Sequence, residues 1–393
     1  MSDRIACPRR NVLRAAAALA LALVAPAAFA QETVRIGLIV PMTGPFASTG
    51  RQIEGAVKLW MQQNGSTVAG KKIEVIVKDD AGTPDTTRRL AQELVNDKVA
   101  VLAGFGLTPL ALATAPIATQ AKVPMIVMAA ATSSIVEQSP MIVRSGFTLP
   151  QITVPLADWA AKNNIRKVVT LVTDYGPGID AENAFKGRFT QAGGQVSESL
   201  RVPLRSPDFA PFLQKVKDNA PDAVFVFVPS GVGSVFMKQF QERGFDKSGI
   251  KLIGTGDVTD DDLLNDMGDA ALGVITSMHY SAAHPSAAMK AYVDGFKKLN
   301  GGMRPNFHSV GAYDGMRLIY KALEATKGST DGEALVNAMK GMQFESPRGP
   351  VTIDPASRDP IQNVYLRKVE KQNGELWNVE FATVPAVKDP LHK

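Results

Sequence analysis

The chain has 393 residues, a formal charge of +5 and a single cysteine, Cys7. Four arginines and one aspartate lie within residues 1–30, so the remaining 363 residues carry a formal charge of only +2. So small a charge gives no electrostatic reason to bind nucleic acid or an anionic membrane, and we expect neither as a partner. The lack of cysteine after residue 30 excludes disulfides, thiolate metal sites and a cysteine nucleophile there.

Residues 1–30 are typical of a secretory signal peptide. Basic residues precede an uncharged apolar run at 15–30, which ends in a small-x-small sequence at 28–30. An uncleaved membrane anchor is the alternative, but the run is short for a span of about 20 residues and contains Pro26. We therefore expect export and cleavage near Ala30. The pair at 9–10 also resembles a twin-arginine signal, so both export routes stay open.

From residue 34 onward, short β-branched runs alternate with amphipathic stretches, which is typical of a parallel sheet with helices on its faces. Thr-Pro pairs mark two helix starts, because threonine is a common N-cap and proline fits the first helical position. The first series is predicted as strands at 34–40, 73–77, 99–103 and 125–127, with helices at 53–61 and from Thr83 and Thr108.

A second α/β series follows residues 144–150. Its predicted strands are 168–172, near 196, 223–228 and 251–253, with helices through Trp159, Phe185 and Phe240 and another from Ser206; helices at 286–299 and 308–327, a Gly/Pro-rich passage at 346–350 and a β-rich tail including 364–369 follow. Open parallel sheets bind ligands beyond the carboxyl ends of their strands, so two facing sheets predict a cleft. Extended crossovers near 144–150 and 276–281 would serve as its hinges.

Catalytic motifs are missing from the sequence. It contains no G-x-S-x-G elbow, H-E-x-x-H pair or P-loop, and the segment 104–106 lacks the third glycine of a dinucleotide fingerprint. We expect no catalytic residue, metal site or cofactor. The histidines have no ligand-like spacing and are expected at the surface or at hinges: His279, His284, His308 and His392.

The acidic cluster at 257–262 has two readings. A calcium or magnesium loop is possible, but the glycine and glutamate of an EF-hand are absent at the required spacing. Capping is favoured instead: Thr259 or Asp260 would begin a helix through Leu263, and the neighbouring acids would suit its dipole. Asp257, just past a predicted strand, remains open to a ligand role.

Three loops at strand ends could contact a ligand. Thr108 could offer its hydroxyl and the free amides of its helix to a carboxylate. The small-residue turn at 129–132 would let the backbone approach a ligand closely, and Tyr175 could close over one while its hydroxyl bonds a polar group. Ordinary capping, turn and packing roles are the alternatives for each loop.

Motifs at the strand ends resemble the leucine/isoleucine/valine-binding proteins, the type I periplasmic receptors of branched-chain amino acid ABC transporters. These motifs are Val40-Pro41-Met42-Thr43-Gly44-Pro45, Lys78-Asp79-Asp80, Ala103-Gly104 and Tyr175-Gly176. The resemblance covers nearly the whole chain after residue 30. It implies an α/β fold of two Rossmann-like lobes with a ligand cleft and hinge crossovers. The implied N-terminal lobe is 31–146 plus 279–346, and the implied C-terminal lobe is 147–278 plus 347–393.

The resemblance also implies a binding site. Positions matching the family's carboxylate site are Thr108, Ala129, Ala131 and Thr132. Thr49 and Tyr175 match residues that contact the ligand from the two lobes. Phe46 and Phe105 would line the pocket beside these positions. Two positions depart from the family. Its ammonium-binding glutamate falls on Gly256, one place before Asp257, and one of its tyrosines falls near Ser230. An α-amino acid would bury an unpaired charge unless Asp257 reached its ammonium.

The loops at 107–109 and 175–180 are also similar to the branch of the family that binds aromatic carboxylates. The resemblance therefore implies a periplasmic ABC transporter component that binds either hydrophobic amino acids or aromatic carboxylates by lobe closure. Its partners would be that small carboxylate ligand and an inner-membrane permease, with the protein itself a monomer. A ligand sensor of the same fold is an alternative, and a periplasmic hydrolase is a less favoured one.

Overall fold

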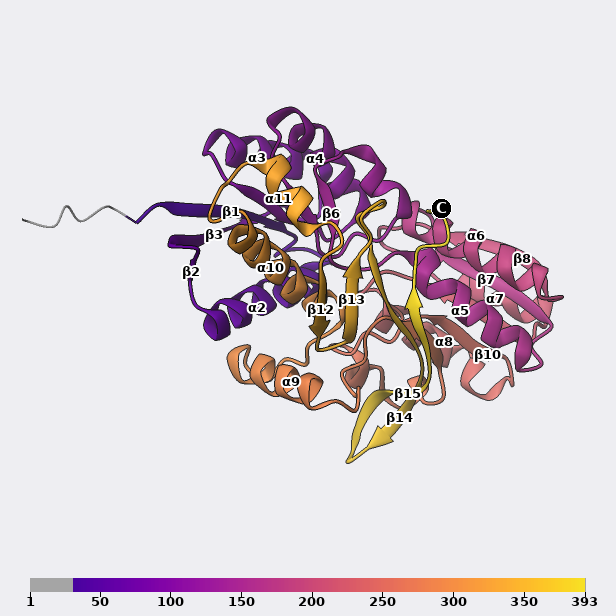
Figure 1. The fold of residues 1–393 in the computed structure, drawn as a ribbon. Coiled ribbons are helices and arrows are strands. Elements are labelled where there is room, and N and C mark those ends of the chain that lie inside the picture. The colour runs from indigo at the N-terminus through magenta and orange to yellow at the C-terminus, as the bar shows by residue number, and fades with distance from the viewer. Residues whose placement is uncertain (1–30, 393) are drawn as a thin grey trace, which may run out of the picture. The chain divides into compact units, whose positions relative to one another are not determined.

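Residues 31–392 are described by a computed structural model, so the predicted signal peptide, Cys7 and the expected cleavage position at Ala30 lie outside the described residues. The chain from Thr33 onward folds around two β-sheets (Figure 1). No helix within 31–392 combines the length and apolar character that a membrane crossing requires.

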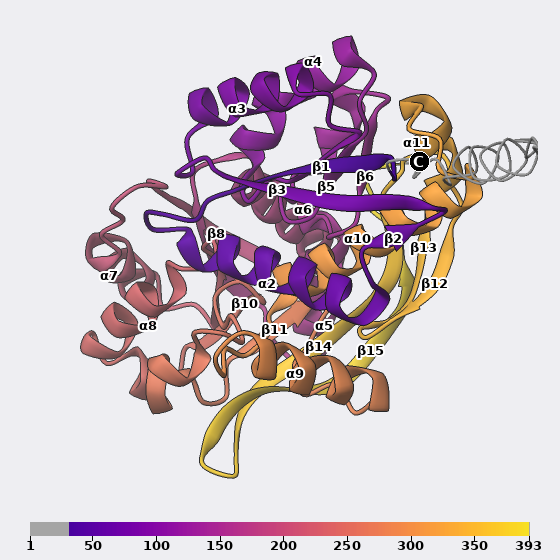
Figure 2. The same ribbon diagram turned by 90° about the vertical axis from the view of Figure 1, so that its left-hand side faces the viewer.

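The first sheet is built from the β-branched runs that precede residue 145. Its strands are parallel except for short β2, which pairs antiparallel with β3 at one edge. Helices α3 and α4 cover one face, while α2 lies with α10 on the other (Figure 2). The order is β2 (Thr67–Val68), β3 (Lys71–Asp79), β1 (Thr33–Val40), β4 (Val101–Gly104), β5 (Met125–Val127), β6 (Ile142–Arg144), with helices α2 (Ala47–Asn64), α3 (Pro84–Asn96), α4 (Thr108–Ala121), α10 (Phe307–Ala325) and the 3-10 turn η1 (Ser133–Gln138).

The second sheet is mixed. Strands β7 to β11 run parallel, and an antiparallel extension begins where β14 pairs with β11. Helices α5 and α6 pack against each other beside its parallel strands. The order is β12 (Gln343–Ser346), β13 (Gly349–Ile353), β14 (Pro360–Gln372), β11 (Ile275–Met278), β10 (Lys251–Thr255), β9 (Ala223–Phe227), β7 (Lys167–Thr173), β8 (Gln195–Val202), with β15 (Glu375–Val387) on β14. Its helices are α5 (Leu149–Lys162), α6 (Gly176–Gln191), α7 (Ala210–Asn219), α8 (Gly233–Glu242) and the 3-10 turns η2 (Phe245–Lys247) and η3 (Leu264–Ala271).

The chain passes between the two sheets three times: from β6 to α5, from β11 to α9 (Ala287–Leu299), and from α11 (Gly332–Met339) to β12. Helices α9 and α10 pack on α2, and α11 packs on α10 and β6, beside the first sheet. The first two passages fall where extended crossovers are predicted. Part of the second is regular structure, however, because Ile275–Met278 pairs with both β10 and β14.

Several local predictions differ from the structure. The helix expected from Ser206 begins at Ala210. The capped helix expected after Thr259 is the 3-10 turn η3, with Leu263 at its N-cap and no side-chain cap. Asp260 is instead fully buried, where it accepts hydrogen bonds from Asn306. His279 and His308 are both buried: His279 lies in the expected crossover at 276–281, whereas His308 lies in the first turn of α10 and not at the surface.

Candidate functional site

A small cavity lies where the carboxyl ends of strands from both sheets meet. Its walls come from the loops after β4, β5, β6, β7, β9 and β10, together with the first turns of α2 and α10. Seven of the residues predicted from sequence line it: Thr49, Thr108, Ala129, Ala131, Tyr175, Ser230 and Asp257. This is the position at which open α/β sheets bind ligands.

Three predicted residues lie outside the cavity wall. Thr132 stands just behind it, where its hydroxyl forms a 2.9 Å hydrogen bond with that of Thr108. Phe105 is fully buried in the core of the first sheet, since its backbone is fixed at φ 67° by hydrogen bonds with Ile39 and Ala130. Phe46 packs with the second apolar core and lines a separate surface hollow. The structure therefore corrects the expectation that the two phenylalanines face this cavity.

One end of the cavity is suited to an anion. The backbone N–H groups of Thr108 and Ala131 have no hydrogen-bond partner among the described residues. Thr108 also opens helix α4, where free N–H groups and the helix dipole favour negative charge. The start of α6 approaches from the other sheet so closely that a Cβ on Gly176 would lie 2.7 Å from the Thr132 hydroxyl. Two helix N-termini thus converge on the Thr108–Thr132 pair.

Arg144 holds the loop that forms this end. The guanidinium is fully buried and donates to the backbone oxygens of Ala130 at 2.7 Å and Thr132 at 2.7 Å. Its Nε donates to Asp359 at 2.7 Å, which balances its charge. Because these carbonyl oxygens point toward Arg144, the loop is held in one conformation at the cavity edge.

Aromatic rings supply much of the apolar wall. Tyr175 and Phe227 are stacked with centroids 6.0 Å apart and an interplanar angle of 27°. Phe147 also lines the cavity and is stacked on His279, with centroids 4.7 Å apart. Stacked and edge contacts of this kind suit a flat aromatic ligand. Phe147 and Phe227 were not identified from the sequence, although Phe227 lies in the strand predicted at 223–228.

Asp257 is a buried carboxyl group in the cavity wall. It is 5% exposed, and its Oδ2 has no hydrogen-bond partner among the described residues. Burial raises the pKa of Asp257 to about 7. The adjacent Gly256 could not carry a larger side chain, because a Cβ there would lie 2.2 Å from the Arg367 guanidinium. The space beside Gly256 is therefore filled by an arginine from β14.

His308 is the one cavity-lining histidine among the described residues, and sequence reasoning gave it no ligand role. It lies in the first turn of α10, which Asn306 caps by accepting hydrogen bonds from the N–H groups of His308 at 3.0 Å and Ser309 at 3.1 Å. Asn306 also donates to Asp260, which bonds Ser230 of the opposite wall. Burial lowers the pKa of His308 to about 3, so its ring is neutral at physiological pH.

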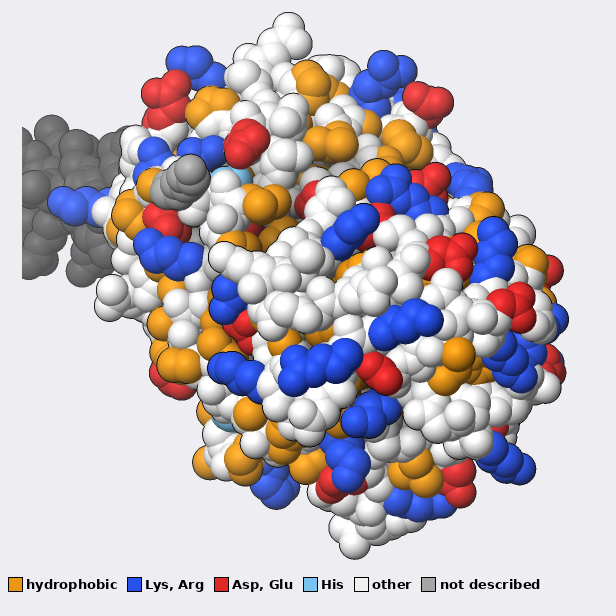
Figure 3. Space-filling view, turned by 90° about the vertical axis from the view of Figure 1, so that its right-hand side faces the viewer, with side chains coloured by type: hydrophobic (Ala, Val, Ile, Leu, Met, Phe, Trp, Pro, Cys, Tyr) orange, Lys and Arg blue, Asp and Glu red, His pale blue; other side chains and the backbone are white. Residues whose placement is uncertain are grey.

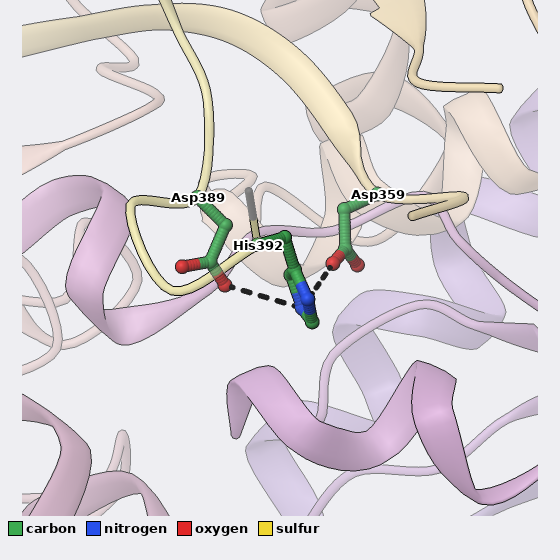
Figure 4. Close-up of side chains that lie close together, drawn as sticks. All are labelled: Asp359, Asp389 and His392. Atoms are coloured by element: carbon green, nitrogen blue, oxygen red, sulfur yellow. Dashed lines mark ion pairs between the residues drawn. The ribbon is translucent and has the colours of Figure 1, made fainter. Parts of the chain in front are cut away.

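A second titratable cluster lies outside the cavity, near the C-terminal end (Figure 4). His392 Nε2 lies 3.2 Å from Asp359 and 3.8 Å from Asp389. Three such groups could in principle hold a cation. Arg144 already neutralises Asp359, so the arrangement is that of an ion-pair network that ties the end of the chain to the loop at 130–133.

Side chains join the two sides of the cavity directly. Ser48 on α2 donates to Asp262 at 2.7 Å, and the backbone N–H of Ser133 donates to Asp180 on α6 at 2.9 Å. These contacts link α2 and η1, beside the first sheet, to the loop after β10 and to helix α6 of the second. The structure therefore shows the two sides closed upon each other.

Known proteins with this architecture bind solutes. The periplasmic binding protein family matches residues 33–375. A solute-binding protein of an ABC transporter from Rhodopseudomonas palustris BisB5, in complex with 3,4-dihydroxybenzoic acid, is 64% identical, with 92% of this chain and 99% of that one covered and a TM-score of 0.90. A solute-binding protein from Rhodopseudomonas palustris HaA2, in complex with p-hydroxybenzoic acid, is 44% identical over 92% and 99% of the two chains, with a TM-score of 0.89.

Curated relatives point to the same class. Leu/Ile/Val-binding protein homolog 6 of Brucella melitensis biotype 1 is 45% identical over 94% of this chain and 95% of its own length. Fold and site together define a type I periplasmic receptor with two α/β lobes. The chain belongs to the periplasmic binding protein family, among the solute-binding proteins of ABC transporters.

Proposed function

We propose that this protein binds aromatic carboxylates, most simply benzoates that carry ring hydroxyls, and delivers them to an ABC importer. The cavity carries the proposal: its anion-favouring end at Thr108 and Ala131 lies beside the stacked rings of Tyr175 and Phe227. A benzoate has a carboxylate for the first feature and a flat face for the second. The benzoate-type ligands of the 64% and 44% identical neighbours support the same ligand class.

Hydrophobic amino acids are the second candidate ligand, favoured by the name of the Brucella relative and by Asp257 in the cavity wall. An amino acid needs an ionised partner for its ammonium. Asp257 has a pKa of about 7 because of burial, and Gly256 cannot supply a second carboxylate without displacing Arg367. These features favour a ligand without an amino group.

Closure of two lobes around the ligand is the proposed mechanism. The proposed lobes are 31–146 plus 279–346 and 147–278 plus 347–393, which turn about the passages near 144–150 and 276–281. A ligand that contacts both walls stabilises the closed form by its differential affinity for that form. The closed receptor, a monomer exported with cleavage near Ala30, then docks on an inner-membrane permease.

Neither catalysis nor nucleic-acid binding belongs to the proposed function. Ser230, the serine in the cavity wall, bonds the carboxyl group of Asp260, not a histidine. A formal charge of +2 after residue 30 gives little attraction to polyanions. On the face shown in Figure 3, basic side chains are interspersed with acidic ones.

A thermal-shift panel tests the ligand class. Mature protein would be heated with benzoate, 4-hydroxybenzoate, phenylpyruvate, phenylalanine and leucine, since a ligand that binds only the folded state raises the melting temperature. Saturating benzoates, at about 100 times Kd, would stabilise by about 2.7 kcal/mol, whereas amino acids would leave the melting temperature unchanged. Stabilisation by leucine alone would reject the aromatic assignment.

A further inference from the structure

Two polar side chains in the cavity wall lack partners that buried polar groups normally have. Asp257 is 5% exposed and His308 is 6% exposed, and both line the cavity. Asp257 Oδ2 and His308 Nδ1 have no hydrogen-bond partner among the described residues. A buried polar atom left unpaired costs about 1 to 3 kcal/mol, so two in one cavity point to partners supplied by a ligand.

The charge of the ligand fixes its direction in the cavity. A carboxylate is attracted to the free N–H groups of Thr108 and Ala131, whereas Asp257 offers it no N–H donor and repels it when ionised. Thr108 follows a strand of the first sheet, whereas Asp257 follows β10 of the second. A benzoate with its carboxylate at Thr108 therefore directs the other end of its ring away from that site and toward Asp257.

We propose that Asp257 and His308 form a hydroxyl-recognition site, at which ring hydroxyls of the ligand pair the free atoms of both side chains. This assignment rests on the proposed function, because it presupposes an aromatic carboxylate in the cavity. Asp257 accepts a hydrogen bond from a phenolic hydroxyl, and neutral His308 pairs a second hydroxyl on the same ring. The preferred substrates are thus hydroxylated and dihydroxylated benzoates, and benzoate itself is a poorer ligand.

The surroundings of Asp257 explain why a neutral donor fits better than a cation. The Arg367 guanidinium is fully buried on β14 behind Gly256; burial raises the pKa of Asp257, and electrostatic interaction with Arg367 opposes part of that rise. Arg367 also carries its own ion pair with Asp261 at 3.4 Å. A ligand ammonium would add a second cation near this guanidinium. A phenolic hydroxyl brings the required proton without a charge.

Calorimetric titration of the mature protein with benzoate, 4-fluorobenzoate, 4-hydroxybenzoate and 3,4-dihydroxybenzoate tests the site. Fluorine is similar in size to a hydroxyl but cannot donate a hydrogen bond. Wild-type protein is therefore expected to bind 4-hydroxybenzoate about 10- to 100-fold more tightly than 4-fluorobenzoate. In Asp257→Leu the two affinities should agree within about threefold, while benzoate binding persists. In His308→Leu the gain from the second hydroxyl of 3,4-dihydroxybenzoate should disappear. Asp266→Leu, at an exposed position, should keep the wild-type ratios.

The wild-type ligand series decides the inference even if a variant fails to fold. Equal affinity for 4-hydroxybenzoate and 4-fluorobenzoate would overturn the hydroxyl-recognition site and leave aromatic-acid binding in place. An undiminished preference for the hydroxyl in folded Asp257→Leu would also overturn it. If no benzoate binds and leucine does, the proposed function fails and the inference fails with it.

Discussion

Thr108 concentrates three contributions to anion binding in one residue. It supplies a hydroxyl bonded to Thr132, a free backbone N–H and the start of α4. Its position after a buried strand and before a proline allowed it to be predicted as a ligand contact from the sequence.

Phe105, three residues earlier, could not be placed from the sequence. Its positive φ turns the ring into the core, and a backbone angle of that kind depends on contacts with β1 and the loop after β5.

Thr108→Val should weaken binding of 4-hydroxybenzoate by about 1 to 3 kcal/mol, because the substitution keeps the shape of the side chain and removes its hydrogen bonds. Thr108→Ser keeps the hydroxyl and should bind within about threefold of wild type. Calorimetric titration measures both. Unchanged affinity in the valine variant would remove the Thr108 hydroxyl from the site.

Asp257 makes stability depend on pH. Burial raises the pKa of Asp257 to about 7 in the folded protein, against 3.8 when unfolded, so the folded state holds this proton more tightly. The carboxyl group therefore costs nothing below pH 3.8 and destabilises increasingly as pH rises toward 7. Several other ionisable groups lie nearby: Tyr175, His308, Arg367 and Asp260. The contribution of Asp257 is therefore measured as the difference in stability between the wild type and an Asp257 variant, because both proteins keep these groups.

Asp257→Asn should thus raise the melting temperature of the unliganded protein at pH 8 by more than at pH 4.5. The difference in unfolding free energy amounts to a few kcal/mol at most, since each pKa unit corresponds to about 1.4 kcal/mol. Thermal unfolding at both pH values checks this. An equal gain at the two pH values would contradict the raised pKa.

At the scale of elements, the start of α6, a helix of the second sheet, lies against the anion site formed by Thr108 and Thr132. Gly176 is required there by close approach, not by backbone strain, because a Cβ would meet the Thr132 hydroxyl at 2.7 Å and the Thr108 methyl at 3.4 Å. On the proposed closure mechanism, this contact forms only when the two sides are closed. Gly187, on the same helix, has nothing within 4 Å of such a Cβ and provides a matched control.

Gly176→Ala should weaken binding of 4-hydroxybenzoate by at least about 10-fold, while the unfolding free energy of the unliganded protein changes by less than about 0.5 kcal/mol. Gly187→Ala should leave affinity at the wild-type value. Calorimetric titration and denaturant unfolding separate the two effects. Normal affinity in Gly176→Ala would show that α6 does not close on the Thr108–Thr132 pair.

Element prediction succeeded where the strands are buried on both faces. Strand β9 and the second half of β1 are continuous apolar runs and were identified at nearly their true bounds. Strands β2 and β6, of two and three residues, show no period and were missed, whereas β5, an equally short but wholly buried apolar run, was identified. Asp260 was assigned to a cap because its role depends on Asn306, 46 residues away, which no local pattern reveals.

At the scale of the whole molecule, the end of the chain returns to the binding loop. His392 contacts Asp359, and Asp359 forms an ion pair with Arg144. Arg144 in turn donates hydrogen bonds to the backbone oxygens of residues 130 and 132. Two α/β halves were evident from the alternation of strands and helices. The path of the last 50 residues was not, because the pairing of β14 with β11 joins segments about 90 residues apart.

His392 should stabilise the protein in a pH-dependent way. Its hydrogen bond with Asp359 raises the pKa of His392 to about 9, above its usual value of 6.5. The stabilisation is therefore fully present below pH 6.5 and lost as pH rises through 9. His392→Gln should lower the melting temperature at pH 6 and have little effect at pH 9.5. A constant difference across that range would mean that His392 acts without its charge.

The position of Arg144 behind the loop, not in the cavity, has a consequence for how cargo is released. No lysine or arginine appears in the part of the cavity wall that the structure describes, so a bound anion is held by peptide dipoles and hydroxyls instead of by a full positive charge. Affinity should then change little with ionic strength, unlike that of a receptor built on exposed ion pairs. Once a transporter separates the two sides, the contacts from one side are lost, and a bound anion could depart without an ion pair to break.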